Sequence, residues 1–179
     1  MYPQHVRTLS LITARARALG VDFTGEQRRE VIALRAGEPW FEGARAAYES
    51  LWDGSATDAD FDAAVPFFYG RWDAAARAHA AADAEQINEA AAEAYASSGA
   101  FDPAAARAAV ARLAAPVLVF AGELDGGPRP RVAADVAELF PHAELAVQPG
   151  AGHYPWLDDP AYFARTVAAF LDRRGQPSG

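Results

Sequence analysis

The chain has 179 residues, a formal net charge of −8 and no cysteine. Because 51% of its residues are hydrophobic and only 22% are charged, it has the composition of a globular protein of about one domain. The acidic balance, without a basic stripe, argues against nucleic acids and anionic membrane surfaces as partners. The lack of cysteine excludes disulfides, thiol catalysis and cysteine-based zinc sites.

No targeting or metal-binding pattern is evident. The longest apolar runs are far too short to cross a bilayer, and the first residues lack the regions of a signal peptide. We therefore expect a cytoplasmic protein that does not bind membranes. The four histidines are scattered without metal-ligand spacing, so we predict neither a metal site nor a cofactor.

The first predicted element is a strand over residues 6–13, which are rich in β-branched and aliphatic side chains. A helical region follows over residues 21–100. Thr24 and Gln27 have the spacing of a capping box, and Pro66 is expected to end or kink a helix. An alanine-rich helical run then continues to about residue 95.

A strand-and-helix pattern replaces the helical region after Asp102 and Pro103, which are typical of a helix start. Residues 116–121 form a continuous apolar run, as expected of a parallel strand covered on both faces. We predict a helix over 131–140 and a short strand over 144–147. The order of elements predicts an α/β fold.

A last helix is predicted to begin at Asp159 and Pro160. The residues expected to face inward from it are apolar and helically spaced: Phe163, Val167, Phe170 and Leu171.

Two candidate catalytic residues, Asp125 and His153, follow neighbouring predicted strands. Because catalytic groups of open α/β sheets lie beyond the carboxyl ends of the strands, we expect the two side chains to meet. An aspartate bound to one ring nitrogen fixes the imidazole tautomer and leaves the other nitrogen free to accept a proton from a nucleophile. Glu123 could equally be the acid.

A family resemblance joins these observations. The stretches that carry it are 116–125, 149–153 and 158–163, which resemble the C-terminal half of the α/β-hydrolase superfamily. The helical region, with the run 66–72, is similar to the cap of proline iminopeptidase-like members, and residues 2–12 resemble the segment leading into the sixth strand. The resemblance implies a partial α/β-hydrolase fold, a three-stranded parallel sheet edge with an all-helical cap insertion.

On this interpretation the chain divides into four parts: the first core strand at 1–20, the helical cap and return helix at 21–115, the strand-helix-strand-helix end of the core at 116–174, and a tail at 175–179. The resemblance implies that Asp125 is the acid and His153 the base of a catalytic triad.

The nucleophile of such a triad is missing from the sequence. The family's serine lies in a Gly-x-Ser-x-Gly elbow, and no such elbow is present. In the family's order this segment precedes residue 1, so we expect a chain that is inactive alone: a truncated gene model, a gene remnant or half of a split enzyme. The unpaired edge of the first strand is then a predicted surface for association.

The resemblance implies a serine hydrolase that acts on an N-terminal peptide bond or a small ester, with a peptide or small molecule as its substrate. Epoxide or haloalkane hydrolysis, with an aspartate nucleophile, is a second enzymatic alternative. A non-catalytic interaction module is the rival class.

The cap would roof the substrate pocket. Tyr69 and Trp72 are candidates for lining it, although most aromatic residues of such an insertion form its own core. Glu85, Glu89 and Glu93 recur at helical spacing, for which a solvated helix face is the simpler interpretation. Because cap acids of prolyl aminopeptidases hold the substrate's amino group, Glu85 and Glu89 are also candidate substrate-binding residues.

Overall fold

The computed structural model describes residues 3–21 and 23–175. Three strands, β1 (Leu9–Ile12), β2 (Val117–Gly122) and β3 (Ala143–Gln148), form one parallel sheet in the order β1-β2-β3. All six residues of β2 are buried. The continuous apolar run that predicted this strand is therefore explained by its central position, covered on both faces.

Twelve helical segments surround the sheet in the described residues. In chain order they are η1 (Pro3–His5), η2 (Arg17–Leu19), α1 (Gly25–Arg35), α2 (Phe41–Asp53), α3 (Asp58–Ala64), η3 (Val65–Phe68), α4 (Ala74–Ala84), α5 (Glu89–Ala96), α6 (Pro103–Val110), α7 (Pro130–Ala137), α8 (Pro155–Asp158) and α9 (Pro160–Gly175). Among these helices, none combines the length and the apolar character that crossing a membrane requires.

The helices begin where the local sequence predicts. Thr24 and Gln27 form the expected capping box, with the Gln27 amide donating to Thr24 Oγ1 and the Thr24 amide donating to Gln27 Oε1. The Asp102 carboxylate caps α6, and Pro103 occupies its first position. Pro66 follows the end of α3 and lies in the 3₁₀ helix η3, as a proline that cannot continue an α-helix should.

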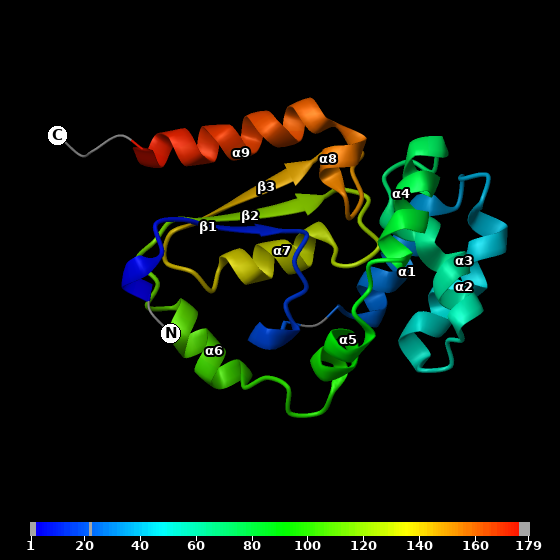
Figure 1. Cartoon of the computed structure of the whole chain (residues 1–179), viewed down its shortest axis with the longest axis horizontal. Helices are drawn as coiled ribbons and strands as arrows, with labels where there is room; N and C mark the ends of the chain where they lie inside the picture. Colours follow the sequence, from blue (N-terminus) through cyan, green and yellow to red (C-terminus); the bar gives the residue numbers. More distant parts are fainter. Residues whose placement is uncertain (1–2, 22, 176–179) are drawn as a thin grey trace.

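The sheet lies between two helical layers (Figure 1). One face packs on α9, where Leu118 and Phe120 meet Phe170. The other face packs on α7, where Val117 and Val119 belong to the largest buried apolar cluster. The fold is thus an α/β layered structure, and the strands direct their carboxyl ends towards α1–α4.

The segment from α1 to α4, here called the cap, has an apolar core of its own. Tyr48 and Phe67 lie at its centre with stacked rings 4.2 Å apart, and both are fully buried. Most cap aromatics therefore pack against one another, as the sequence interpretation anticipated.

Two details of the helical predictions are wrong. The alanine-rich run is not one helix, because α4 ends at Ala84 and α5 begins after Asn88, which caps it. Glu85 therefore does not share a helix face with Glu89. On α9, Leu171 is 46% exposed rather than inward-facing.

Candidate active site

Asp125 lies in the turn that follows β2. Its backbone amide donates to Gly122 O, at 3.3 Å, and its Oδ1 accepts the amide of Gly127 at 2.8 Å, so the carboxylate is fixed by its own turn. The cap supports this turn, because the Tyr48 hydroxyl donates to Gly126 O at 2.6 Å. Asp125 is completely buried.

His153 lies in the loop between β3 and α8, and two other parts of the chain hold its backbone. Its amide donates to Phe68 O of the cap at 2.7 Å, and its carbonyl accepts the Thr13 hydroxyl at 2.9 Å. Thr13 directly follows β1 and has a φ of 46°, a left-handed conformation that non-glycine residues seldom adopt. The histidine is therefore fastened both to the cap and to the carboxyl end of β1.

The structure brings the two predicted residues together. His153 Nδ1 lies 2.9 Å from Asp125 Oδ2, and the histidine side chain is 27% exposed. A carboxylate only accepts hydrogen bonds, so the proton of this contact belongs to Nδ1. In the neutral ring the lone pair is then on Nε2, which is the arrangement that a general base requires.

Glu123, the alternative acid, is engaged elsewhere. Its Oε2 accepts a hydrogen bond from the amide of Gly150 at 2.8 Å, at an exposed position of the loop that carries His153. The geometry thus selects Asp125 as the partner of His153.

Glycines allow the cap and the histidine loop to approach closely. A Cβ on Gly152 would lie 2.5 Å from the Gly70 amide nitrogen and from Phe68 O, both of them cap backbone atoms. The Asp158 carboxylate bridges the two segments, because its Oδ2 accepts the amides of Gly152 at 2.8 Å and Gly70 at 3.3 Å. The loop and the cap are therefore joined backbone to backbone.

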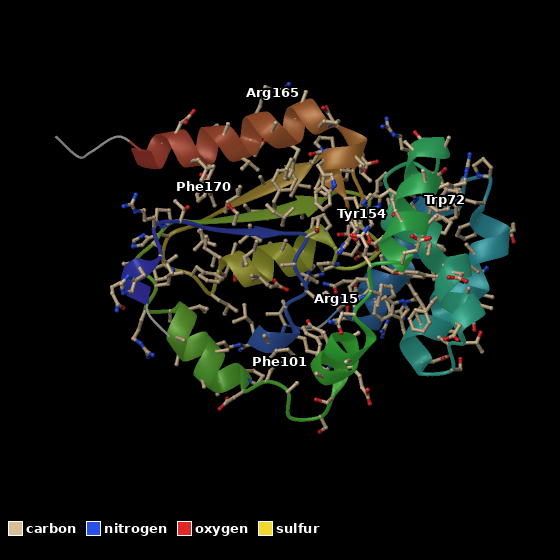
Figure 2. The ribbon with its side chains drawn as sticks, viewed as in Figure 1. Arg15, Trp72, Phe101, Tyr154, Arg165 and Phe170 are labelled. Atoms are coloured by element: carbon tan, nitrogen blue, oxygen red, sulfur yellow. The ribbon has the colours of Figure 1, made fainter. Side chains whose placement is uncertain are left out.

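A cavity of about 490 Å³ opens beside His153, between the core and the cap. Its lining residues come from both parts and include Trp52, Phe68, Tyr69, Asp83 and Tyr154. Figure 2 shows Tyr154 between the carboxyl ends of the strands and α4. His153 thus faces a largely apolar space of the size that small-ligand sites have.

A polar cluster forms one wall of this cavity. The Tyr154 hydroxyl donates to Asp83 Oδ2 at 3.1 Å, and the Tyr69 hydroxyl lies 2.8 Å from His79 Nδ1. The Tyr69 and Tyr154 rings are 4.8 Å apart. Asp83 and Tyr154 were missed as site residues at the level of sequence, because their contact joins segments far apart in the chain and no local pattern marks them. His79 contacts Tyr69 within the cap and is not among the residues that line the cavity.

This cluster leads to a prediction about alkaline stability. Burial, and next the charge of Asp83, raise the pKa of Tyr69 to about 12. Neutral Tyr69 therefore contributes stability that is fully present below about pH 10 and is lost between about pH 10 and pH 12, because the unfolded chain ionises first there. Urea unfolding at pH 8 and pH 11 should show a larger loss of free energy of unfolding for the wild type than for Tyr69→Phe.

The control is Tyr95→Phe, which removes the hydroxyl of a more exposed ring on α5. Its loss between the two pH values should match that of the wild type. If Tyr69→Phe and the wild type lost the same free energy of unfolding between pH 8 and pH 11, the raised pKa of Tyr69 would be contradicted.

Of the four residues predicted to bind substrate, the structure places one in the lining of the His153 cavity. Tyr69 lines the cavity beside His153. Trp72 packs on Tyr69, with ring centroids 5.2 Å apart, but lines a separate cavity with Trp40. Glu85 is exposed at the end of α4, outside the lining of the His153 cavity. The side chain of Glu89 lies outside the described part of the structure.

Within the described residues, no hydroxyl is bound to His153 Nε2. The hydroxyls of Ser50 and Ser97 donate to carbonyl oxygens of their own helical turns, and that of Ser55 donates to Asp53. The same part of the chain contains no group of three or more His, Asp or Glu residues placed to hold a metal ion.

Comparisons with known proteins bear on the fold. No family model and no curated protein matches the chain. Solved structures do match. The Mycobacterium smegmatis proline iminopeptidase is 24% identical, with a TM-score of 0.58, over 96% of this chain and 58% of its own. A thermophilic esterase from Thermogutta terrifontis is 21% identical, with a TM-score of 0.55, over 98% and 59%. MenH from S. aureus is 15% identical, with a TM-score of 0.61, over 98% and 64%.

The chain therefore has a partial α/β-hydrolase fold, a three-stranded parallel sheet flanked by helices. It is similar to a proline iminopeptidase and to esterases, and it spans less than two thirds of the length of each of the three structures. Because the sequence identities are this low, the similarity to these structures shows a shared fold and nothing more.

Proposed function

We propose that His153 and Asp125 are the general base and the orienting acid of a hydrolase site whose hydroxyl nucleophile comes from outside these 179 residues. The observation that carries the proposal is the 2.9 Å contact between His153 Nδ1 and the completely buried Asp125 carboxylate, at the wall of a cavity. In such a site His153 Nε2 takes the proton of the attacking hydroxyl, and Asp125 stabilises the imidazolium that forms.

The isolated chain allows the first test, because the imidazole tautomer does not depend on a nucleophile. Long-range proton–nitrogen NMR spectra of ¹⁵N-labelled protein, recorded with the imidazole neutral, report which ring nitrogen carries the proton. We expect Nδ1 to be protonated in the wild type and the preference to be lost in Asp125→Ala. Protonation of Nε2 in the wild type would refute the proposal.

The isolated chain should also lack turnover. With p-nitrophenyl esters and aminoacyl naphthylamides as substrates, we expect wild type and His153→Ala to give the same background rate. A rate that falls in His153→Ala would show that the chain supplies its own nucleophile.

We infer further that the substrate is a peptide with a free N-terminus rather than a neutral ester. Asp83 supports this substrate class, because its carboxylate lines the same cavity as His153 and Tyr154 orients one of its oxygens. Besides His153, the charged groups of the lining are the carboxylates of Asp62 and Asp83 and the guanidinium of Arg15. Two carboxylates against one guanidinium favour a ligand with one ammonium group. Tyr69 and Tyr154 offer aromatic faces to such a cation.

Ligand binding tests this inference without catalysis. NMR titration with L-prolinamide, which is cationic, should give an affinity roughly two- to five-fold weaker for Asp83→Asn than for the wild type, the range of an exposed ion pair. Binding of N-acetyl-L-prolinamide, which is neutral, should be the same for both proteins.

Glu85→Gln is the matched control, since Glu85 is an exposed acid at the end of the same helix and outside the cavity lining. A larger effect in Glu85→Gln than in Asp83→Asn would move the ammonium site to Glu85, the acid that helical spacing first indicated.

A further inference from the structure

We propose that Arg15 binds the C-terminal carboxylate of the substrate, so that the site selects short peptides with both termini free. The inference rests on the proposed function and extends it to the other end of the substrate. Arg15 lies in the segment between β1 and η2 and is exposed. It makes no hydrogen bond or ion pair with the described residues. Its guanidinium is therefore available to a ligand.

Arg15 lines two cavities that share part of their walls. One is the His153 cavity; the other has a volume of about 560 Å³ and a mostly apolar lining that includes Phe23, Tyr95 and Val132. Figure 2 shows Arg15 in the segment after β1 and close to α5. The residues that line both cavities are Arg15, Trp52, Phe61 and Gly127. Arg15 is therefore the charged residue where the two spaces meet.

The two cavities differ in the sign of their charges. The carboxylates of Asp62 and Asp83 line the His153 cavity. Among the described residues that line the second cavity, the charged ones are Arg15 and Arg17, and none is acidic. Carboxylates thus lie on the side of His153, and guanidiniums lie towards the second cavity. A zwitterionic ligand, with an ammonium group at one end and a carboxylate at the other, complements this distribution.

Of the two guanidiniums, Arg15 is the one that can bind the carboxylate. Arg17 already uses both terminal nitrogens, because Nη1 donates to Tyr95 O at 3.1 Å and Nη2 donates to Ser97 O at 3.3 Å. These bonds hold the end of α5, which carries Tyr95 at the wall of the second cavity. The N–H donors of Arg15 have no such partners within the described residues. A guanidinium presents its donors in a fork that matches both oxygens of a carboxylate.

These positions order a peptide along the site. Its ammonium group lies with Asp83, and the carbonyl of its first residue lies beside His153. The next residue extends towards Arg15, and its side chain enters the second cavity, whose lining favours a bulky apolar group. Because Arg15 and His153 line the same cavity, the chain that follows the scissile bond is short. A dipeptide with an apolar second residue is the substrate that this arrangement favours.

The test compares a dipeptide with its amide. NMR titration of the full chain with L-prolyl-L-phenylalanine and with L-prolyl-L-phenylalaninamide gives the two affinities. We expect the wild type to bind the free acid roughly two- to five-fold more tightly than the amide, the range of an exposed ion pair. Arg15→Gln should bind the two equally, because its side chain is neutral. Arg15→Lys should keep part of the preference, since it retains the charge but loses the fork.

Arg165→Gln is the matched control. Arg165 is an exposed arginine of α9, which covers the face of the sheet opposite α7 (Figure 2). The substitution makes the same change in net charge outside both cavity linings. We expect Arg165→Gln to keep the wild-type preference for the free acid. A loss as large as that in Arg15→Gln would mean that net charge sets the preference, and it would overturn the proposal.

A third ligand tests whether both termini are recognised. N-acetyl-L-prolyl-L-phenylalanine keeps the carboxylate but lacks the ammonium group, so it should bind the wild type more weakly than the free dipeptide. Equal binding would make the ligand a simple apolar carboxylate and would overturn the assignment of a peptide with two free termini.

The remaining outcomes separate this subsite from the proposed function. Equal affinity of the wild type for acid and amide, or an unchanged preference in Arg15→Gln, would overturn the role of Arg15 whatever the tautomer of His153 is. An Arg15-dependent preference together with a proton on His153 Nε2 would retain the carboxylate subsite and overturn the proposed function.

Discussion

Once a nucleophile is supplied, Asp125→Asn is expected to lower kcat by about 10⁴-fold, because an amide in place of the carboxylate can favour the wrong tautomer of His153. Asp125 is completely buried and bound to His153 Nδ1 at 2.9 Å, so no water or neighbouring carboxylate can replace it. The measurement is ester hydrolysis by the complex of the chain with a serine-bearing core segment.

Glu123→Gln is the matched control for Asp125→Asn. Glu123 follows the same strand and was the alternative acid, but its carboxylate binds the amide of Gly150 rather than the imidazole. We expect Glu123→Gln to lower kcat by less than tenfold. Losses of similar size in the two variants would mean that the acid is not uniquely Asp125.

Gly122→Ala is expected to lower the free energy of unfolding by about 3 kcal/mol, the upper range for overpacking a core. A Cβ on Gly122 would lie 2.1 Å from Gly152 O and 2.5 Å from Ala151 O. Both are backbone atoms of the histidine loop, so no side-chain rotation can relieve the overlap. Urea unfolding of the isolated chain gives the value.

Gly43→Ala is the matched control for the same substitution. Gly43 lies within α2, and nothing lies within 4 Å of a Cβ placed there. Since alanine is the better helix former, we expect this variant to be more stable by roughly 0.5–1 kcal/mol. If the two variants had equal free energies of unfolding, the loop that carries His153 would have to shift to accommodate the extra methyl group.

Features encoded over a few residues could be predicted from the sequence. The capping pair Thr24 and Gln27 satisfies backbone groups within a single turn, and the apolar run of β2 reflects burial on both faces. Asp125 and His153 could be paired because the ends of adjacent parallel strands must lie together, whatever the surrounding side chains are.

The walls of the cavity could not be predicted in the same way. Asp83 faces Tyr154 only because the cap folds onto the histidine loop. That approach depends on backbone contacts between segments more than 80 residues apart, such as the bond from the His153 amide to Phe68 O. Helical spacing drew attention to Glu85 instead, although a break in the helix separates it from Glu89.

The shared carboxylate of Asp158 has a consequence for how the molecule opens. One oxygen atom accepts the amides of both Gly70 and Gly152, and the neighbouring His153 amide is bound to the same cap segment. These three N–H groups are therefore released in a single opening event and should exchange with deuterium at a common rate. A cap joined in this way is not a hinged lid, because lifting it would displace His153 as well. On the proposed function, we therefore expect substrate to enter through the mouth of the cavity.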